Sequence, residues 1–113
     1  MLSRTVPLIA IGGSRVSGFV QVTERNGSFL ATVSARGLTP GLHAVHIHRG
    51  NCANPYAGVH LTVLGLLAAD GSGSGTLAAG IGSVYVAPGR YVIVYASSSP
   101  QIIVGCADLV ALS

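Results

Sequence analysis

Apolar and polar residues alternate along most of the chain, and β-branched residues are frequent in the alternating runs. This period of two residues predicts β-strands rather than helices. The expected strands span residues 5–11, 17–23, 28–35, 43–48, 76–79, 83–86, 90–96 and 102–112. The longest stretch without a clear strand runs from 49 to about 59, and a loop of that length in a small domain is often functional.

Glycine-rich turns separate the expected strands. Asn26-Gly27 lies between two alternating runs and predicts a tight hairpin. Seven or eight short strands with regular turns predict an all-β antiparallel sandwich or barrel. A length of 113 residues predicts that residues 1–113 form one domain with a single core.

Composition narrows the function classes. Half of the residues are hydrophobic and only 8% are charged, so we expect surface to be hidden in a homo-oligomer or against a partner. No run approaches the ~20 apolar residues that span a bilayer, so no membrane span is expected. The apolar run 6–11 is short and contains Pro7, which makes it a poor signal-peptide core. We therefore expect any export signal to have been removed from this sequence.

Charged residues are few and scattered. The six basic residues are all arginines that stand singly, and a net charge of +3 without a cluster does not predict nucleic-acid binding. Glu24, Asp70 and Asp108 are the only acids, so calcium or magnesium sites are not expected. No phosphate-binding glycine loop, nucleophile elbow or carboxylate pair is present, and no catalytic residue is assigned.

The two cysteines, Cys52 and Cys106, lie far apart in sequence and form no CxxC motif, which excludes a zinc ribbon or thioredoxin site. They are either two buried thiols or one long-range disulfide. The disulfide would imply an oxidising compartment.

All four histidines fall between positions 43 and 60. His46 and His48 stand two apart on an expected strand, so their side chains share one face, whereas His43 points to the other. His60 could complete a three-nitrogen metal site, with His43 as a supporting residue that hydrogen-bonds behind it. The alternative is a half-exposed polar strand face without a ligand. Imidazole ligands suit zinc, copper, iron or nickel, and the spacing does not choose among them.

The histidine segment resembles a known family. Residues 37–48 (GLTPGLHAVHIH) are similar to the copper-site strand of copper–zinc superoxide dismutases, and residues 57–60 (AGVH) resemble the segment with the metal-bridging histidine. Cys52 precedes the second segment at nearly the family spacing, and later segments align in order: 66–71, 91–95 and 104–107. The resemblance implies an eight-stranded Greek-key barrel, one copper ion bound by His46, His48 and His60, and a Cys52–Cys106 disulfide.

The chain also departs from the family pattern. Residues 61–65 contain no histidine or aspartate where the zinc ligands should follow, so no zinc is expected. Tyr95 stands where the family has its last copper-ligating histidine, either as a fourth ligand or as a rim residue over the site. The long loop that steers superoxide is reduced to residues 97–100, and Ile102-Ile103 replace the active-site arginine.

These features predict a copper-binding, superoxide-dismutase-like protein with weak or absent dismutase activity. It is expected to be periplasmic, secreted or in the cell envelope, with a metal ion and superoxide as partners. One alternative is an active copper-only dismutase, because family members without zinc are known. Another is a metal-free β-sandwich with a structural or association role, which resembles chordin-type extracellular domains.

Overall fold

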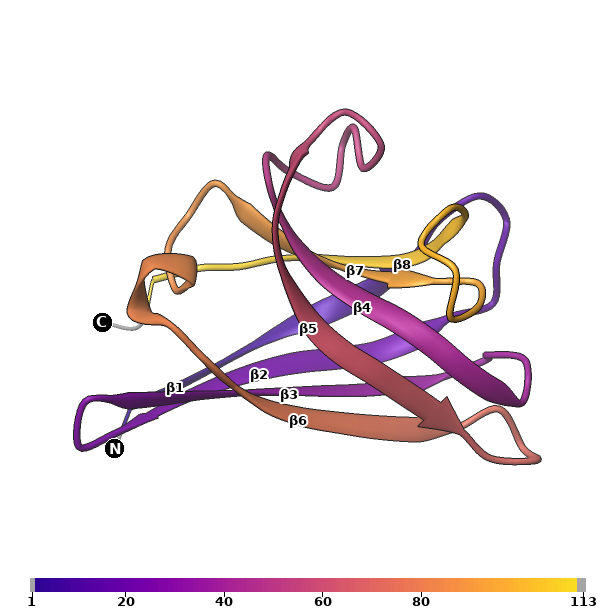
Figure 1. Cartoon of the computed structure of the whole chain (residues 1–113), viewed down its shortest axis with the longest axis horizontal. Helices are drawn as coiled ribbons and strands as arrows, with labels where there is room; N and C mark the ends of the chain where they lie inside the picture. The colour runs from indigo at the N-terminus through magenta and orange to yellow at the C-terminus, as the bar shows by residue number, and fades with distance from the viewer. Residues whose placement is uncertain (1, 112–113) are drawn as a thin grey trace.

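Eight antiparallel strands form a nearly closed barrel (Figure 1). The computed structural model describes residues 2–111. One short 3₁₀ helix, η1, is the only helix in that range. The elements are β1 (Leu2–Ala10), β2 (Ser17–Arg25), β3 (Ser28–Arg36), β4 (Gly41–Arg49), β5 (Val59–Ala69), β6 (Gly75–Ile81), η1 (Ser83–Tyr85), β7 (Arg90–Tyr95) and β8 (Ile103–Asp108).

The strand order is β5-β4-β7-β8-β1-β2-β3-β6. The non-consecutive neighbours β4–β7 and β3–β6 come from Greek-key crossovers. β1 pairs with β2 along most of its length but with β8 only through Ile9–Cys106 and Ala10–Gly105. β5 and β6 are the two ends of the sheet. This confirms the predicted all-β, superoxide-dismutase-like architecture.

The barrel core is filled by alternate residues of the strands. Its fully buried members include Val20, Val33, Val45, Ile47, Leu67, Val92 and Val94. A second, smaller cluster lies on the other face of β7, where Tyr91, Ile93 and Tyr95 pack with Cys52 and Cys106. β7 is therefore buried on both faces, which explains its uninterrupted apolar sequence. The two tyrosines of this second cluster lie beside the histidines.

Three of the strand expectations differ from the structure. Residues 83–86 are not a strand, because η1 spans Ser83–Tyr85 in a short segment between Gly82 and Pro88. A long strand, β5, was missing from the expected set, since its bulges break the simple alternation. The last expected strand ends early: β8 stops at Asp108, and residue 112 lies outside the described residues.

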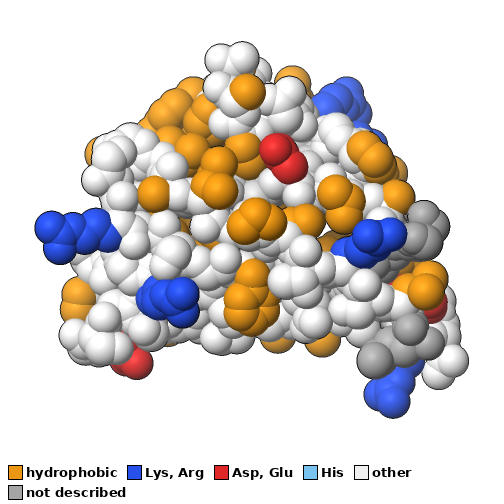
Figure 2. Space-filling view, turned by 180° about the vertical axis from the view of Figure 1, so that it is seen from behind, with side chains coloured by type: hydrophobic (Ala, Val, Ile, Leu, Met, Phe, Trp, Pro, Cys, Tyr) orange, Lys and Arg blue, Asp and Glu red, His pale blue; other side chains and the backbone are white. Residues whose placement is uncertain are grey.

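The predicted hairpin and the predicted long loop agree with the structure. The hairpin between β2 and β3 turns at Asn26 and Gly27, whose φ angles of 53° and 80° are those of a tight turn with both central residues left-handed. The loop between β4 and β5 is the one expected around residues 49–59. No helix within residues 2–111 is long and apolar enough to cross a membrane. Figure 2 shows no broad basic patch on the described part of the face it presents.

Candidate metal centre

His46 and His48 project from the outward face of β4. Their neighbours Val45 and Ile47 fill the barrel core, so alternation sends the two imidazoles to the opposite face. β4 is held between β5 and β7, which fixes its backbone on both sides. Both imidazoles are partly buried. The strand therefore presents two positioned nitrogen donors side by side.

His60 reaches the same face from β5 because of two irregularities in the β4–β5 ladder. The register shifts by one residue between Val45 and His46, and again between Ile47 and His48. Together the two bulges bring His60 opposite His48. Residues directly opposite in an antiparallel pair point to the same face. His60 is exposed, in contrast to the two histidines of β4.

The three imidazoles form a cluster that fits a metal ion. One ring nitrogen from each of His46, His48 and His60 lies within 4.8 Å of the others. Two nitrogens that bind one ion at 2.0–2.1 Å are at most about 4.2 Å apart, so a small side-chain adjustment suffices. The ring centroids of His46 and His60 are 4.8 Å apart, and those of His48 and His60 are 5.3 Å apart. Among residues 2–111 this is the one group of three or more histidine, cysteine or acidic side chains arranged in this way.

The electrostatics of the cluster favour the neutral forms of His46 and His48. Burial lowers the pKa of His46, and the charge of His60 followed by that of His48 lowers it further. Burial and then His60 also lower the pKa of His48, while the nearby backbone of Gly58 acts in the opposite direction. Nδ1 of His48 is buried and has no well-formed hydrogen bond. Neutral imidazole is the form that binds metals, so the lowered pKa values of His46 and His48 favour metal binding.

Tyr95 closes one side of the cluster from β7. Its ring centroid lies 5.0 Å from that of His46, edge to face, and its hydroxyl oxygen lies 3.5 Å from Nε2 of His48. The pKa of the phenol is raised, first by burial and then by the neighbouring phenols of Tyr91 and Tyr56. The structure therefore places a neutral phenol beside the cluster, with its hydroxyl close to His48.

His43 lies behind the cluster, on the other face of β4. It is 1% exposed. Its Nδ1 lies 2.8 Å from the carbonyl oxygen of Tyr95, and its Nε2 lies 2.7 Å from that of Thr39. A neutral ring donates to one of these carbonyls, and a protonated ring donates to both. His43 thus ties the start of β4 to the end of β7, on which Tyr95 stands.

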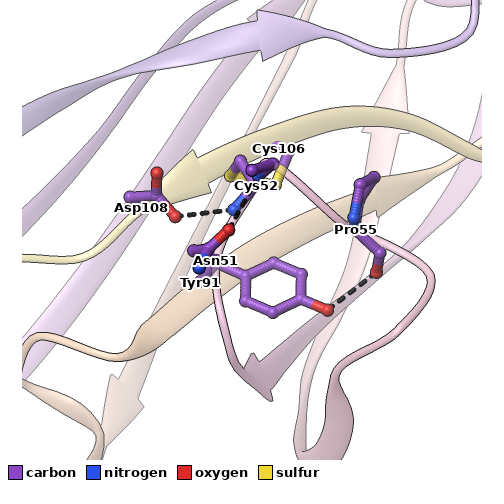
Figure 3. The surroundings of a disulfide bond; sticks show 7 residues. Asn51, Cys52, Pro55, Tyr91, Cys106 and Asp108 are labelled. Atoms are coloured by element: carbon purple, nitrogen blue, oxygen red, sulfur yellow. Dashed lines mark hydrogen bonds between the residues drawn. A yellow bond between two sulfur atoms is a disulfide. The ribbon is translucent and has the colours of Figure 1, made fainter.

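A disulfide fixes the loop between His48 and His60. Cys52 and Cys106 are bonded, as the resemblance implied. Figure 3 shows two further ties of the loop: the backbone N–H of Cys52 donates to Oδ1 of Asp108 at 2.8 Å, and the hydroxyl of Tyr91 donates to the carbonyl of Pro55 at 2.7 Å. The disulfide fits an extracytoplasmic location.

Sequence reasoning missed two residues of this site. Tyr91 is fully buried, and its ring lies 5.6 Å from that of His48. Gly58 packs so closely against the Tyr91 hydroxyl and the carbonyl of Arg49 that a Cβ would collide with both. The alternation of β7 would have placed Tyr91 on the same face as Tyr95, but nothing in the sequence indicated that loop residues 50–58 cover it.

The fold and the cluster together define a superoxide-dismutase-like β-barrel with a three-histidine group on its outer face. The sequence is similar to a copper–zinc superoxide dismutase of Caulobacter vibrioides, with 39% identity over 79 residues. That match covers 62% of this chain and 45% of the relative, so the chain spans less than half of the relative's length. No family model matches the sequence. The relative and the fold confirm the resemblance found in the sequence.

Proposed function

We propose that this protein binds one copper ion through His46, His48 and His60. The observation that carries the proposal is the convergence of their three ring nitrogens within 4.8 Å, on two adjacent strands. The lowered pKa values of His46 and His48 supply neutral donors. The relative is named as a copper–zinc enzyme, which favours copper over the other metals that imidazole suits.

The residues that follow His60 support a site without zinc. The segment that follows His60 forms β5, and its next residues are Leu61, Thr62 and Val63, which offer no histidine or carboxylate. The three acids of the chain accept hydrogen bonds elsewhere: Asp108 from Cys52, Asp70 from its own turn and Glu24 from Gly27. A second ion beside His60 would therefore lack protein ligands.

Dismutase activity is expected to be weak or absent. Copper would supply the one-electron chemistry by changing its oxidation state, and three imidazoles without a fourth favour the reduced ion. Two positions of the described chain also fail to supply a cation that would attract superoxide to the site: Arg49 lies on the opposite face of β4, and Ile102 and Ile103 follow the short loop after β7. Tyr95 forms the rim with a neutral hydroxyl, although a role as fourth ligand is the alternative that spectroscopy decides.

Copper uptake tests the proposal directly. Titration of the metal-free protein should reach one copper per chain, and a His46→Ala/His48→Ala variant should lose it. Val63→Ala, on the exposed surface of β5, is the matched control and should retain full stoichiometry. Uptake that is absent, or that survives in the double variant, would sink the proposal and favour a metal-free role in structure or association.

Superoxide decay separates the two copper-binding functions. If the copper-loaded protein is no faster than free copper or than the double variant, it is a copper-binding protein without dismutase activity. A clearly faster rate, lost in the double variant, would identify an active copper-only dismutase with superoxide as substrate. The disulfide supports an oxidising compartment for either form, and we propose the periplasm, cell envelope or exterior.

A further inference from the structure

Two arginines face each other at one end of the barrel wall. Arg49, the last residue of β4, is directly opposite Arg90, the first residue of β7. Opposite residues in an antiparallel pair have Cβ atoms about 4.5–5.5 Å apart, and like charges in this position repel. Such an arrangement is unfavourable unless something with negative charge lies between or beside the guanidinium groups.

The backbone holds this pair in place. Gly50 donates to the carbonyl of Gly89 at 3.0 Å, just beyond the pair, and Leu109 donates to the carbonyl of Arg90 at 2.9 Å. Alternation puts both side chains on the core-facing side of their strands, since Ile47 and Val92 are in the barrel core. The pair therefore lies at the barrel end, with Arg49 exposed and Arg90 half-buried, on the face of the sheet opposite the histidine cluster.

Nothing in the described chain neutralises the two arginines. Neither guanidinium forms a hydrogen bond or ion pair with a described residue, and Nε of Arg90 is buried with no partner. The three acids are each occupied elsewhere. Glu24 accepts from Gly27, Asp70 accepts from Ser72 and Ser74, and Asp108 accepts from Cys52. A buried charged N–H without an acceptor is costly, so an acceptor from outside the chain would stabilise this site.

We propose that Arg49 and Arg90 form a binding site for a tetrahedral oxyanion of the phosphate class. The planar fork of each guanidinium matches two oxygens of such an anion. Guanidinium groups from two neighbouring strands can bind different oxygens of one tetrahedral anion. A carboxylate has only two oxygens, and one guanidinium group binds both. The site is separate from the proposed copper ligands and does not depend on them.

Inorganic phosphate is the probe, titrated into the full chain at an ionic strength held constant with sodium chloride. Calorimetry or NMR should show saturable binding of one phosphate per chain. Arg49→Gln and Arg90→Gln should each weaken the affinity by at least about tenfold, the loss expected for charge-assisted hydrogen bonds. Arg15→Gln removes an equal charge from an exposed turn and is the matched control, so its affinity should equal that of the wild type.

Arg49→Glu gives a test in the opposite direction. The new carboxylate would pair with Arg90, so this variant should bind no phosphate and should unfold at a higher temperature than the phosphate-free wild type. Phosphate should raise the unfolding temperature of the wild type but not that of Arg49→Glu. Non-saturable binding, or an equal loss of affinity in Arg15→Gln and Arg49→Gln, would overturn the proposal.

A phosphate group could come from free phosphate or from a lipid headgroup. Sedimentation with vesicles of phosphatidylglycerol and phosphatidylcholine distinguishes these sources. Vesicle binding that is lost in both Arg49→Gln and Arg90→Gln identifies the headgroup, and phosphate binding without vesicle binding identifies the free anion. Vesicle binding that both variants retain, with no saturable phosphate binding, contradicts the site.

Discussion

His60 lies directly opposite His48 across the β4–β5 ladder, with ring centroids 5.3 Å apart. This pairing makes the histidine cluster a property of two strands rather than of one motif. His48 is partly buried, and its strand is bonded on both sides, whereas His60 is exposed on a strand at the end of the sheet. The cluster thus combines two firmly held donors with one that is open to solvent.

Removal of His60 should affect copper binding far more than folding. His60→Ala removes one of three proposed ligands. Loss of a residue that only supports a ligand lowers metal affinity by up to about 100-fold, so we expect loss of the ligand itself to lower copper affinity by at least that factor. Because the side chain is exposed, the free energy of unfolding of the metal-free protein should change by no more than about 0.5 kcal/mol. Competition with a copper chelator and urea unfolding measure the two quantities. Val59→Ala, the exposed neighbour on β5, serves as the control and should change neither.

The sequence predicted the histidines of the site but not the way they come together. Alternation placed His46 and His48 on one face of a strand, because that requires only the period of two. A regular ladder continued from the Val45–Gly65 pair would have put Thr62 opposite His48. Only the two bulges correct this, and a bulge depends on packing between strands that a single sequence does not reveal. The resemblance to a known family supplied what local pattern could not.

The stability of the metal-free protein should fall in mild acid. His46 and His48 have pKa values below the ordinary 6.5, chiefly because of burial. The unfolded chain therefore takes up these protons at a higher pH than the folded chain does. The stabilising effect is complete above about pH 6.5 and is lost as the pH falls through the folded-state pKa values. Urea unfolding at pH 7.5 and 5.5 measures the loss. If His46→Ala/His48→Ala loses the same free energy of unfolding between these pH values, other groups cause the loss. Asp70 is not one of them, because its lowered pKa lies well below this pH range.

Tyr95 should act as a rim residue whose hydroxyl is dispensable. Burial raises the pKa of its phenol, so the neutral form persists at pH 7 and should not bind copper as phenolate. Tyr95→Phe should then change copper affinity by less than about threefold, or under 1 kcal/mol. The copper-loaded wild type should show no phenolate-to-copper absorption band. A visible band that disappears in Tyr95→Phe would instead make Tyr95 the fourth ligand.

Tyr95→His offers the complementary change. A fourth imidazole at this position suits the oxidised ion, which prefers four donors in a plane. We expect tighter binding of Cu(II) and a lower reduction potential than in the wild type, as measured by EPR and redox titration. An unchanged potential would indicate that the side chain at position 95 does not reach the metal.

His43 should matter for folding but not for the number of copper ions bound. His43→Leu leaves the carbonyls of Thr39 and Tyr95 without the ring that faces them, at a cost of about 1–3 kcal/mol in the free energy of unfolding. Leu42→Ala, at the exposed position before it, should cost less than about 0.5 kcal/mol. Copper stoichiometry should stay at one per chain in both. If His43→Leu abolishes uptake in a folded protein, His43 is more than a supporting residue.

The fold was more predictable than the loops that shape the site. Regular alternation gave seven of the eight strands, and Asn26-Gly27 gave its hairpin, because both depend on local chemistry. The burial of Tyr91 could not be inferred, since it comes from residues 50–58 folding back over β7. That loop is held by contacts distant in sequence, such as Tyr91 to Pro55 and Cys52 to Asp108.

Loss of the disulfide should therefore weaken the protein in two separable ways. The bond joins residues 54 apart, and the chain-entropy model gives about 4 kcal/mol for a loop of that size. Cys52→Ala/Cys106→Ala should lose a free energy of unfolding of that order. It should also bind copper more weakly, because the loop that connects His48 to His60 and holds Gly58 beside the site is no longer tied to β8. Tyr91→Phe removes only the hydrogen bond to Pro55 and should cost about 1 kcal/mol with a smaller loss of copper affinity. Equal copper affinity in the wild type and the double variant would show that the remaining contacts hold the loop without the disulfide.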